Sequence, residues 1–103
     1  MSSPSGASSG VHWRADIASL VFPVGDGAIC AVHRGALRTL LGTEPTPEAS
    51  LGYFARFEAA FRAAAHAKIA RKRILPGTNL HLTSRDIARK LLEAGQSERG
   101  EQP

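Results

Sequence analysis

The sequence contains a single cysteine, Cys30, so no disulfide can form within the chain. Apolar runs are short, and none approaches the length that crosses a membrane. The first residues contain neither the early cations nor the apolar stretch of a secretory signal peptide. These absences argue against a disulfide-stapled secreted protein and an integral membrane protein. They predict a soluble cytoplasmic protein with no membrane partner.

Motifs for catalysis are also missing. Residues 6–10 (GASSG) match the nucleophile-elbow string, but they lie in a serine-rich stretch with no strand before them. Residues 25–27 (GDG) begin like a dinucleotide-binding loop, but a strand-forming run follows where that loop needs a helix. Carboxylates are sparse and form no close pair on one helix face, so acid–base chemistry lacks its usual partners. We predict a protein that is not an enzyme and that has no cofactor.

Candidate metal ligands are few and badly spaced. Cys30 and His33 have the C-x-x-H spacing, but residues three apart on a strand point to opposite faces. A structural zinc site needs about four converging nitrogen or sulfur ligands. We therefore predict no metal site, and we interpret Cys30 as a small buried thiol and His33 as a surface imidazole.

Both ends of the chain are poor in apolar side chains. Residues 1–10 are mainly serine, glycine, proline and alanine, and residues 94–103 are mainly polar. Such segments cannot offset the conformational entropy that is lost on ordering. We predict disordered tails at residues 1–10 and 94–103 around a single folded domain at residues 11–93, which is long enough for one modest core.

Three strands are predicted. The runs 17–22 and 28–33 are rich in strand formers, and the Asp26-Gly27 pair between them is a strong signal for a hairpin turn. The segment 78–82 alternates apolar and polar residues and is expected to join the same sheet.

Three helices are predicted in the rest of the chain. Residues 34–41 form a short one, and residues 48–72 form a long one in which phenylalanines recur at helical spacing. A last helix follows residue 83, where Thr83 and Asp86 have the spacing of a capping box. The order β-β-α-α-β-α predicts an α+β fold, with a small antiparallel sheet and helices packed on one of its faces.

Three segments carry a resemblance to a known family. They are VFPVGDGAICAVHRGAL, the helical YFARFEAAFRAAAHAKI and the closing LHLTSRDI. In order and spacing they are similar to a family of short bacterial proteins, domain-of-unknown-function family 1488, over roughly residues 18–90. The resemblance implies a compact α+β fold in a bacterial protein. It implies no activity and no catalytic residues.

Positive charge is concentrated in the second half of the chain. Nine cations and three anions lie between residues 54 and 93, whereas the whole chain has a net charge of +4. Two interpretations stay open. The cations at the end of the long helix complement the negative end of the helix dipole, or they join those of the last helix in one patch that contacts an acidic partner.

These observations lead to two functional hypotheses. The first is a non-enzymatic interaction or regulatory module with an unknown protein partner. The alternative is weak, non-specific binding of nucleic acid through phosphate contacts. The residues that would carry this alternative are Arg71, Lys72, Arg73, Arg85, Arg89 and Lys90.

Overall fold

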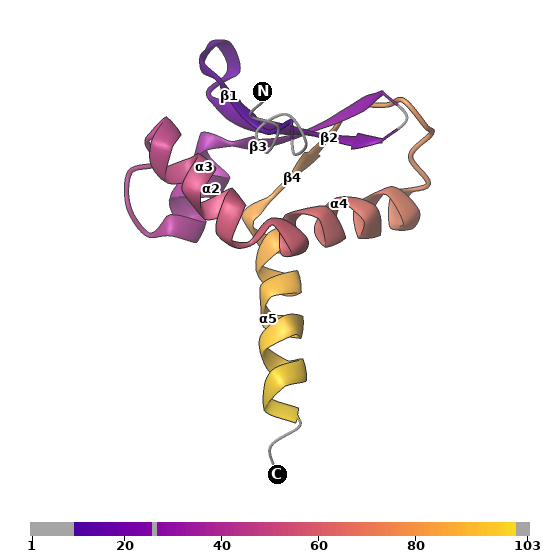
Figure 1. The fold of residues 1–103 in the computed structure, drawn as a ribbon. Coiled ribbons are helices and arrows are strands. Elements are labelled where there is room, and N and C mark those ends of the chain that lie inside the picture. The colour runs from indigo at the N-terminus through magenta and orange to yellow at the C-terminus, as the bar shows by residue number, and fades with distance from the viewer. Residues whose placement is uncertain (1–9, 26, 101–103) are drawn as a thin grey trace, which may run out of the picture.

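A computed structural model describes residues 10–25 and 27–100, with side chains as far as residue 94 (Figure 1). Residues 1–9 and 101–103, the greater part of one predicted tail and the end of the other, lie outside the described residues. In chain order, with η1 a 3₁₀ helix, the elements are β1 (His12–Arg14), η1 (Ala15–Ile17), β2 (Ser19–Gly25), β3 (Ala28–His33), α2 (Arg34–Leu41), α3 (Pro47–Arg56), α4 (Glu58–Lys72), β4 (Leu80–Leu82) and α5 (Ser84–Gly100).

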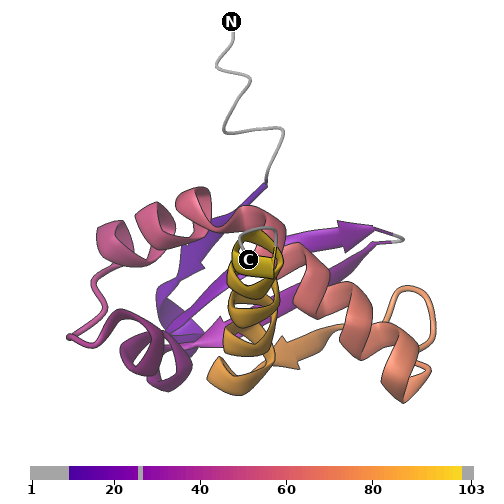
Figure 2. The same cartoon turned by 90° about the horizontal axis from the view of Figure 1, so that it is seen from below.

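The predicted α+β fold is confirmed. The four strands form one sheet in the order β1-β2-β3-β4, and the four α-helices lie together on one face of it, as the view along α5 shows (Figure 2). The hairpin β2–β3 lies where the sequence predicts it, and β1 adds an edge strand that the sequence did not separate from β2.

The sheet is mixed, whereas a wholly antiparallel one was expected. The pairs β1–β2 and β2–β3 are antiparallel, but β3 and β4 run parallel. The reason lies in the connection, because α2, α3 and α4 carry the chain back across one face before β4 begins. A strand that is reached through such a helical crossover runs in the same direction as the strand before it.

The predicted long helix is divided at Phe57, which leaves the helical conformation with φ −118° and ψ 31°. No proline or glycine stands at this point. The ring centroids of Phe54 and Phe61 lie 5.1 Å apart across the break, and both rings lie in one core.

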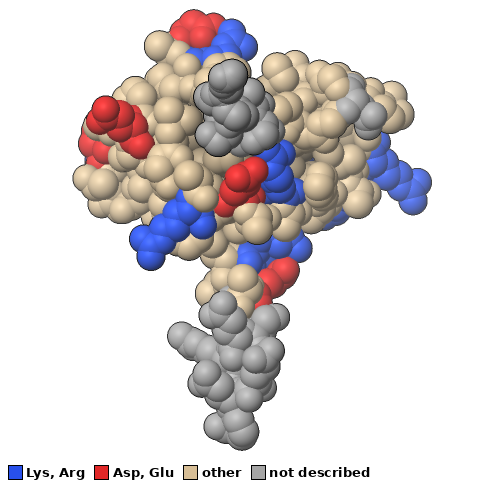
Figure 3. Space-filling view, in the orientation of Figure 1, with Lys and Arg blue, Asp and Glu red and all other residues tan. Residues whose placement is uncertain are grey.

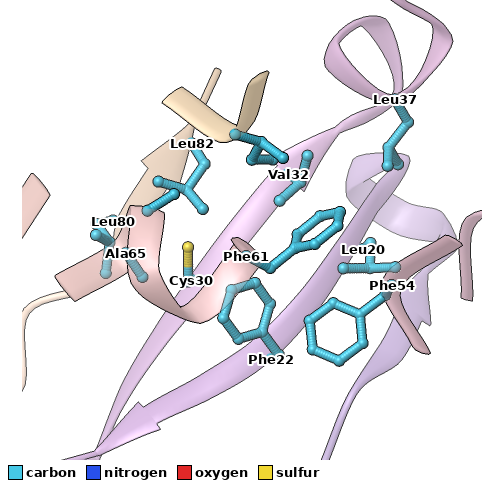
Figure 4. Packing of buried hydrophobic residues seen from close by; sticks show 12 residues of the cluster. Leu20, Phe22, Cys30, Val32, Leu37, Phe54, Phe61, Ala65, Leu80 and Leu82 are labelled. Atoms are coloured by element: carbon cyan, nitrogen blue, oxygen red, sulfur yellow. The ribbon is translucent and has the colours of Figure 1, made fainter. Parts of the chain in front are cut away.

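That core lies between the sheet and the helices (Figure 4). Phe22 from β2 meets Phe54 at 4.9 Å and Phe61 at 6.3 Å between ring centroids. Aliphatic side chains from the sheet and from α2 and α5 complete the cluster: Leu20, Val32, Leu37, Leu80, Leu82 and Ile87. The burial of these apolar side chains is the main contribution to the stability of a domain of this length.

Helix α5 begins with the predicted capping box. The hydroxyl of Thr83 accepts a hydrogen bond from the Asp86 backbone N–H at 3.1 Å, and the Asp86 carboxylate accepts one from the Thr83 backbone N–H at 2.9 Å. The helix then projects away from the body (Figure 1) and continues to Gly100. Residues 94–100, assigned to a tail by their composition, therefore belong to this helix. They include alanine, glutamine, glutamate and arginine, which are good helix formers.

Candidate interaction surfaces

The first candidate surface is the corner where α5 leaves α4. Two hollows lie there, of about 290 and 320 Å³, and Lys90 and Glu93 line both of them. We call the surface of both hollows the α4–α5 corner. Its lining residues are Ala59, Ala60, Ala63, Ala64, Ala67, Arg71, Asp86, Arg89, Lys90, Glu93 and Ala94. Because most of the α4 residues in this list are alanines, the floor is apolar and lets another chain approach closely.

The structure brings together half of the six cations that the sequence proposes for nucleic-acid binding. Arg71, Arg89 and Lys90 line the same hollow. Lys72, Arg73 and Arg85 are exposed but do not line it. The predicted patch is therefore divided between the corner and the surfaces next to it.

Carboxylates stand among the cations of the corner, as Figure 3 shows at the base of α5. Asp86 lies 3.4 Å from the Lys68 ammonium and 3.6 Å from the Arg71 guanidinium, and Glu93 lies 3.0 Å from the Lys90 ammonium. Burial alone would raise the pKa of Asp86. Hydrogen bonding by Thr83, together with Lys68, overcomes this effect and holds that pKa below its ordinary value.

Lys68 also contacts β4, which is an edge strand of the sheet. Its ammonium donates a hydrogen bond to the backbone carbonyl of His81 in β4 at 2.5 Å. An edge strand with free backbone groups is a template for pairing with another chain. The contact with Lys68 occupies one of the backbone carbonyls of β4.

The second candidate surface is the sheet face that the helices leave uncovered. Apart from η1, no helix in residues 10–25 and 27–100 lies on it (Figure 1). We call it the open face, and it consists of His12, Ile17, Ser19, Val21, Pro23, Ile29, Ala31, His33 and His81, with Arg14 and Asn79 at its border. A hollow of about 100 Å³ lies at its centre.

A serine and two imidazoles are ordered at one end of the open face. The Ser19 hydroxyl donates to the Ile17 carbonyl at 2.9 Å, so at 2.8 Å from His33 its oxygen accepts the proton of Nδ1. The rings of His33 and His81 stack with centroids 4.7 Å apart and an angle of 18° between their planes. Stacked rings direct their in-plane lone pairs side by side, so this pair does not converge on one metal ion.

Cys30 and His33 lie on opposite faces of β3, as strand alternation predicts. Cys30 is buried in the core, whereas His33 is exposed on the open face. Burial raises the pKa of the Cys30 thiol to about 12, so at neutral pH it is protonated and is not a nucleophile. Within the described residues, no three His, Cys, Asp or Glu side chains are grouped to hold a metal ion.

The sequence interpretation missed the open face, although a signal for it is present. A strand with one solvated face alternates apolar and polar residues, but Leu20, Val21 and Phe22 are consecutive apolar residues. Val21 is 1% exposed even though no α-helix in the described residues covers it, and it lines the same hollow as Ile17 and Ile29. The consecutive apolar residues of β2 were therefore the sequence signal that the second face of the sheet is apolar as well.

No protein-family model, curated protein or solved structure matches the chain. The resemblance to family 1488 stays a hypothesis. None of the helices in the described part of the chain is long and apolar enough to cross a membrane.

Proposed function

We propose that this protein is a non-enzymatic interaction module that docks an acidic helical segment of a partner protein in the α4–α5 corner. The observation that carries the proposal is the corner itself, in which an alanine floor adjoins cations from two helices. Helix-in-groove recognition requires an apolar floor for the buried side of the incoming helix and charges at its border for orientation.

The charges of the corner favour an acidic partner. Arg71, Arg89 and Lys90 outnumber Asp86 and Glu93 among its lining residues. Arg89 and the neighbouring Arg85, Lys72 and Arg73 form no ion pair within the described residues. Such cations attract an acidic segment and fix its register more than they add affinity.

The carboxylates favour a protein over a nucleic acid. Asp86 and Glu93 stand inside the corner and interrupt its cations, so the cations do not form the continuous basic stripe that a phosphate backbone contacts. No aromatic side chain lines either hollow, so bases have nothing to stack on. Alanines, in contrast, suit the apolar face of a helix.

An NMR titration tests this function, with two probes at low and moderate salt. One probe is a synthetic amphipathic helix of leucine and glutamate, and the other is a short DNA duplex. We expect the peptide to shift the amides of residues 59–71 and 86–94. The double variant Arg71→Gln/Arg89→Gln should weaken peptide binding by about tenfold, because two charged contacts at a rim are each worth up to about 1 kcal/mol.

The matched control is Lys72→Gln/Arg73→Gln, which removes the same charge beside the corner. It should weaken binding about twofold at most, through long-range attraction alone. Equal losses in both double variants, with tighter binding of the duplex than of the peptide, would favour the nucleic-acid alternative. If neither probe shifts the corner, the proposal is wrong. Circular dichroism of each variant establishes that the fold is retained.

We also propose that the protein lies in the cytoplasm of a bacterium, in keeping with the resemblance to family 1488. It is also in keeping with the single cysteine, which can form no disulfide within the chain. Fractionation of cells that express the tagged protein tests the location. Recovery in the membrane fraction would contradict it.

A further inference from the structure

We infer that the open face is the contact between two copies of this chain, related by a two-fold axis. Two aliphatic side chains stand exposed on it, Ile17 at 40% and Ile29 at 36%. Val21 and Ala31, which are only 1% and 6% exposed, form the floor of the hollow between them. In a two-fold contact the same patch serves both copies, so the isoleucines of one copy meet those of the other.

The central hollow does not suit a small-molecule ligand. Its volume of about 100 Å³ is well below the range of about 300–1,000 Å³ that is typical of ligand sites. The groups around it are mainly aliphatic, and its charged member, Arg14, is bound to Asp16 at 2.5 Å. A hollow of this kind receives a side chain from an opposing surface.

Charge selects a second copy as the occupant. Arg14 and Asp16 neutralise each other at the border of the open face. Placing this face against itself therefore sets no like charges opposite each other. The α4–α5 corner has an excess of cations, and self-association there would bring like charges together.

Residues 1–9 are a poorer occupant. The segment MSSPSGASS contains one large apolar side chain, Met1, so it offers little to bury against Ile17 and Ile29. A second copy brings the exposed side chains of Ile17 and Ile29.

The contact is small, and the dimer should therefore be weak. Four strands at about 4.8 Å spacing and a length of about five residues give an area on the order of 350 Å² per copy. A total near 700 Å² is below the size of stable interfaces, so we expect association only at high concentration. Because α5 projects from the other side of the sheet (Figure 1), both α4–α5 corners stay free in such a dimer.

The test is NMR on the full chain at pH 7, in a mixture of ¹³C-labelled and unlabelled protein. Filtered spectra detect only contacts between copies. We expect such contacts from the methyl groups of Ile17 and Ile29. We also expect sedimentation velocity to show a dimer fraction that rises with concentration. In Ile29→Lys, which places two ammonium groups against each other, the dimer fraction should fall at least tenfold.

The control variant is Leu75→Lys, which makes the same chemical change at a residue that is 73% exposed and lies off the open face. It should dimerise like the unaltered chain. Contacts of Ile17 that appear only within one copy, to residues 1–9, would overturn the inference. So would a sedimentation coefficient that does not change with concentration, or equal loss of dimer in both variants. The corner takes no part in this test, so its outcome is independent of the proposed function.

Discussion

The two faces of strand β2 differ in what covers them, although their residues alternate along one short segment. Leu20 and Phe22 point into a core that four helices enclose. Ser19 and Val21 point to the open face, where only η1 and neighbouring side chains shield them. Both sets are almost fully buried, but the first is held by packing within the chain and the second lies at a surface. Stability should therefore reside on the helical face and association on the open one.

The largest effect should come from the helical face. Phe61 is fully buried and its ring contacts those of Phe22, Tyr53 and Phe54. Phe61→Ala should lower the free energy of unfolding by about 3–5 kcal/mol, because a buried ring is replaced by a cavity. Urea denaturation of the two proteins measures the difference.

Ile29→Ala is the counterpart on the open face. Measured where the protein is monomeric, it should change the free energy of unfolding by less than about 1 kcal/mol, because the side chain is already partly in water. A loss at Ile29 as large as that at Phe61 would mean that the two faces do not divide these roles.

Sequence reasoning succeeded where local signals decide. The pairing of β2 with β3, the capping box of Thr83 and Asp86 and the helical spacing of the phenylalanines were all readable from the sequence, and together they indicated the α+β class. It failed where distant residues decide. The break at Phe57 has no proline or glycine to signal it, and the parallel direction of β4 follows from a crossover of three helices.

The candidate surfaces divide in the same way. Arg71, Arg89 and Lys90 could be named as cations from the sequence, but the crossing of α4 and α5 decides that they share a hollow and that Lys72, Arg73 and Arg85 do not. From the sequence, the alanines that form the floor of that hollow could be placed only on the side of the helix opposite its phenylalanines. The open face could not be assigned, because the sequence does not state which side of a sheet the helices cover.

The second-largest loss of stability should come from replacing a carboxylate. The test compares one carboxylate from each side of the molecule. The side chain of Asp86 is 13% exposed and joins the capping box to Lys68 and Arg71. Asp86→Asn should destabilise the protein by about 1–2 kcal/mol at pH 7, since it removes charged hydrogen bonds at a helix start. The pKa of Asp86 is lowered in the folded protein, so its contribution is complete above the ordinary value of 3.8 and is lost as the pH falls below it.

Asp16→Asn is the control for Asp86→Asn. The hydrogen bond from Arg14 also lowers the pKa of Asp16, but the side chain of Asp16 is 61% exposed and water screens the pair. Urea denaturation from pH 7 to pH 3 should show the difference between Asp86→Asn and the unaltered chain shrinking toward pH 3. It should show little difference for Asp16→Asn at any pH. A pH-independent difference for Asp86→Asn would mean that packing and not charge makes Asp86 important.

The smallest effects should come from two fully buried serines, one in the sheet and one in a helix, and the two effects should differ in sign. Ser19, on the open face, donates to Ile17 and accepts from His33. Ser50, in α3, has a buried hydroxyl oxygen with no hydrogen-bond partner in the described structure. A buried hydroxyl without a partner keeps its desolvation penalty, whereas a bonded one recovers it. Ser19→Ala should therefore destabilise the protein by about 1 kcal/mol, and Ser50→Ala should leave it unchanged or stabilise it by up to about 1 kcal/mol.

Thermal and urea unfolding of both serine variants, at a concentration where the chain is monomeric, measures these two changes. Ser19→Ala also releases the imidazole of His33, so the His33 ring resonances should shift while those of the core phenylalanines stay in place. If both variants lose the same stability, the hydroxyl of Ser50 has a partner in solution. The open face would then have no more polar order than the helical one, since a buried serine would be hydrogen-bonded to the same extent on each.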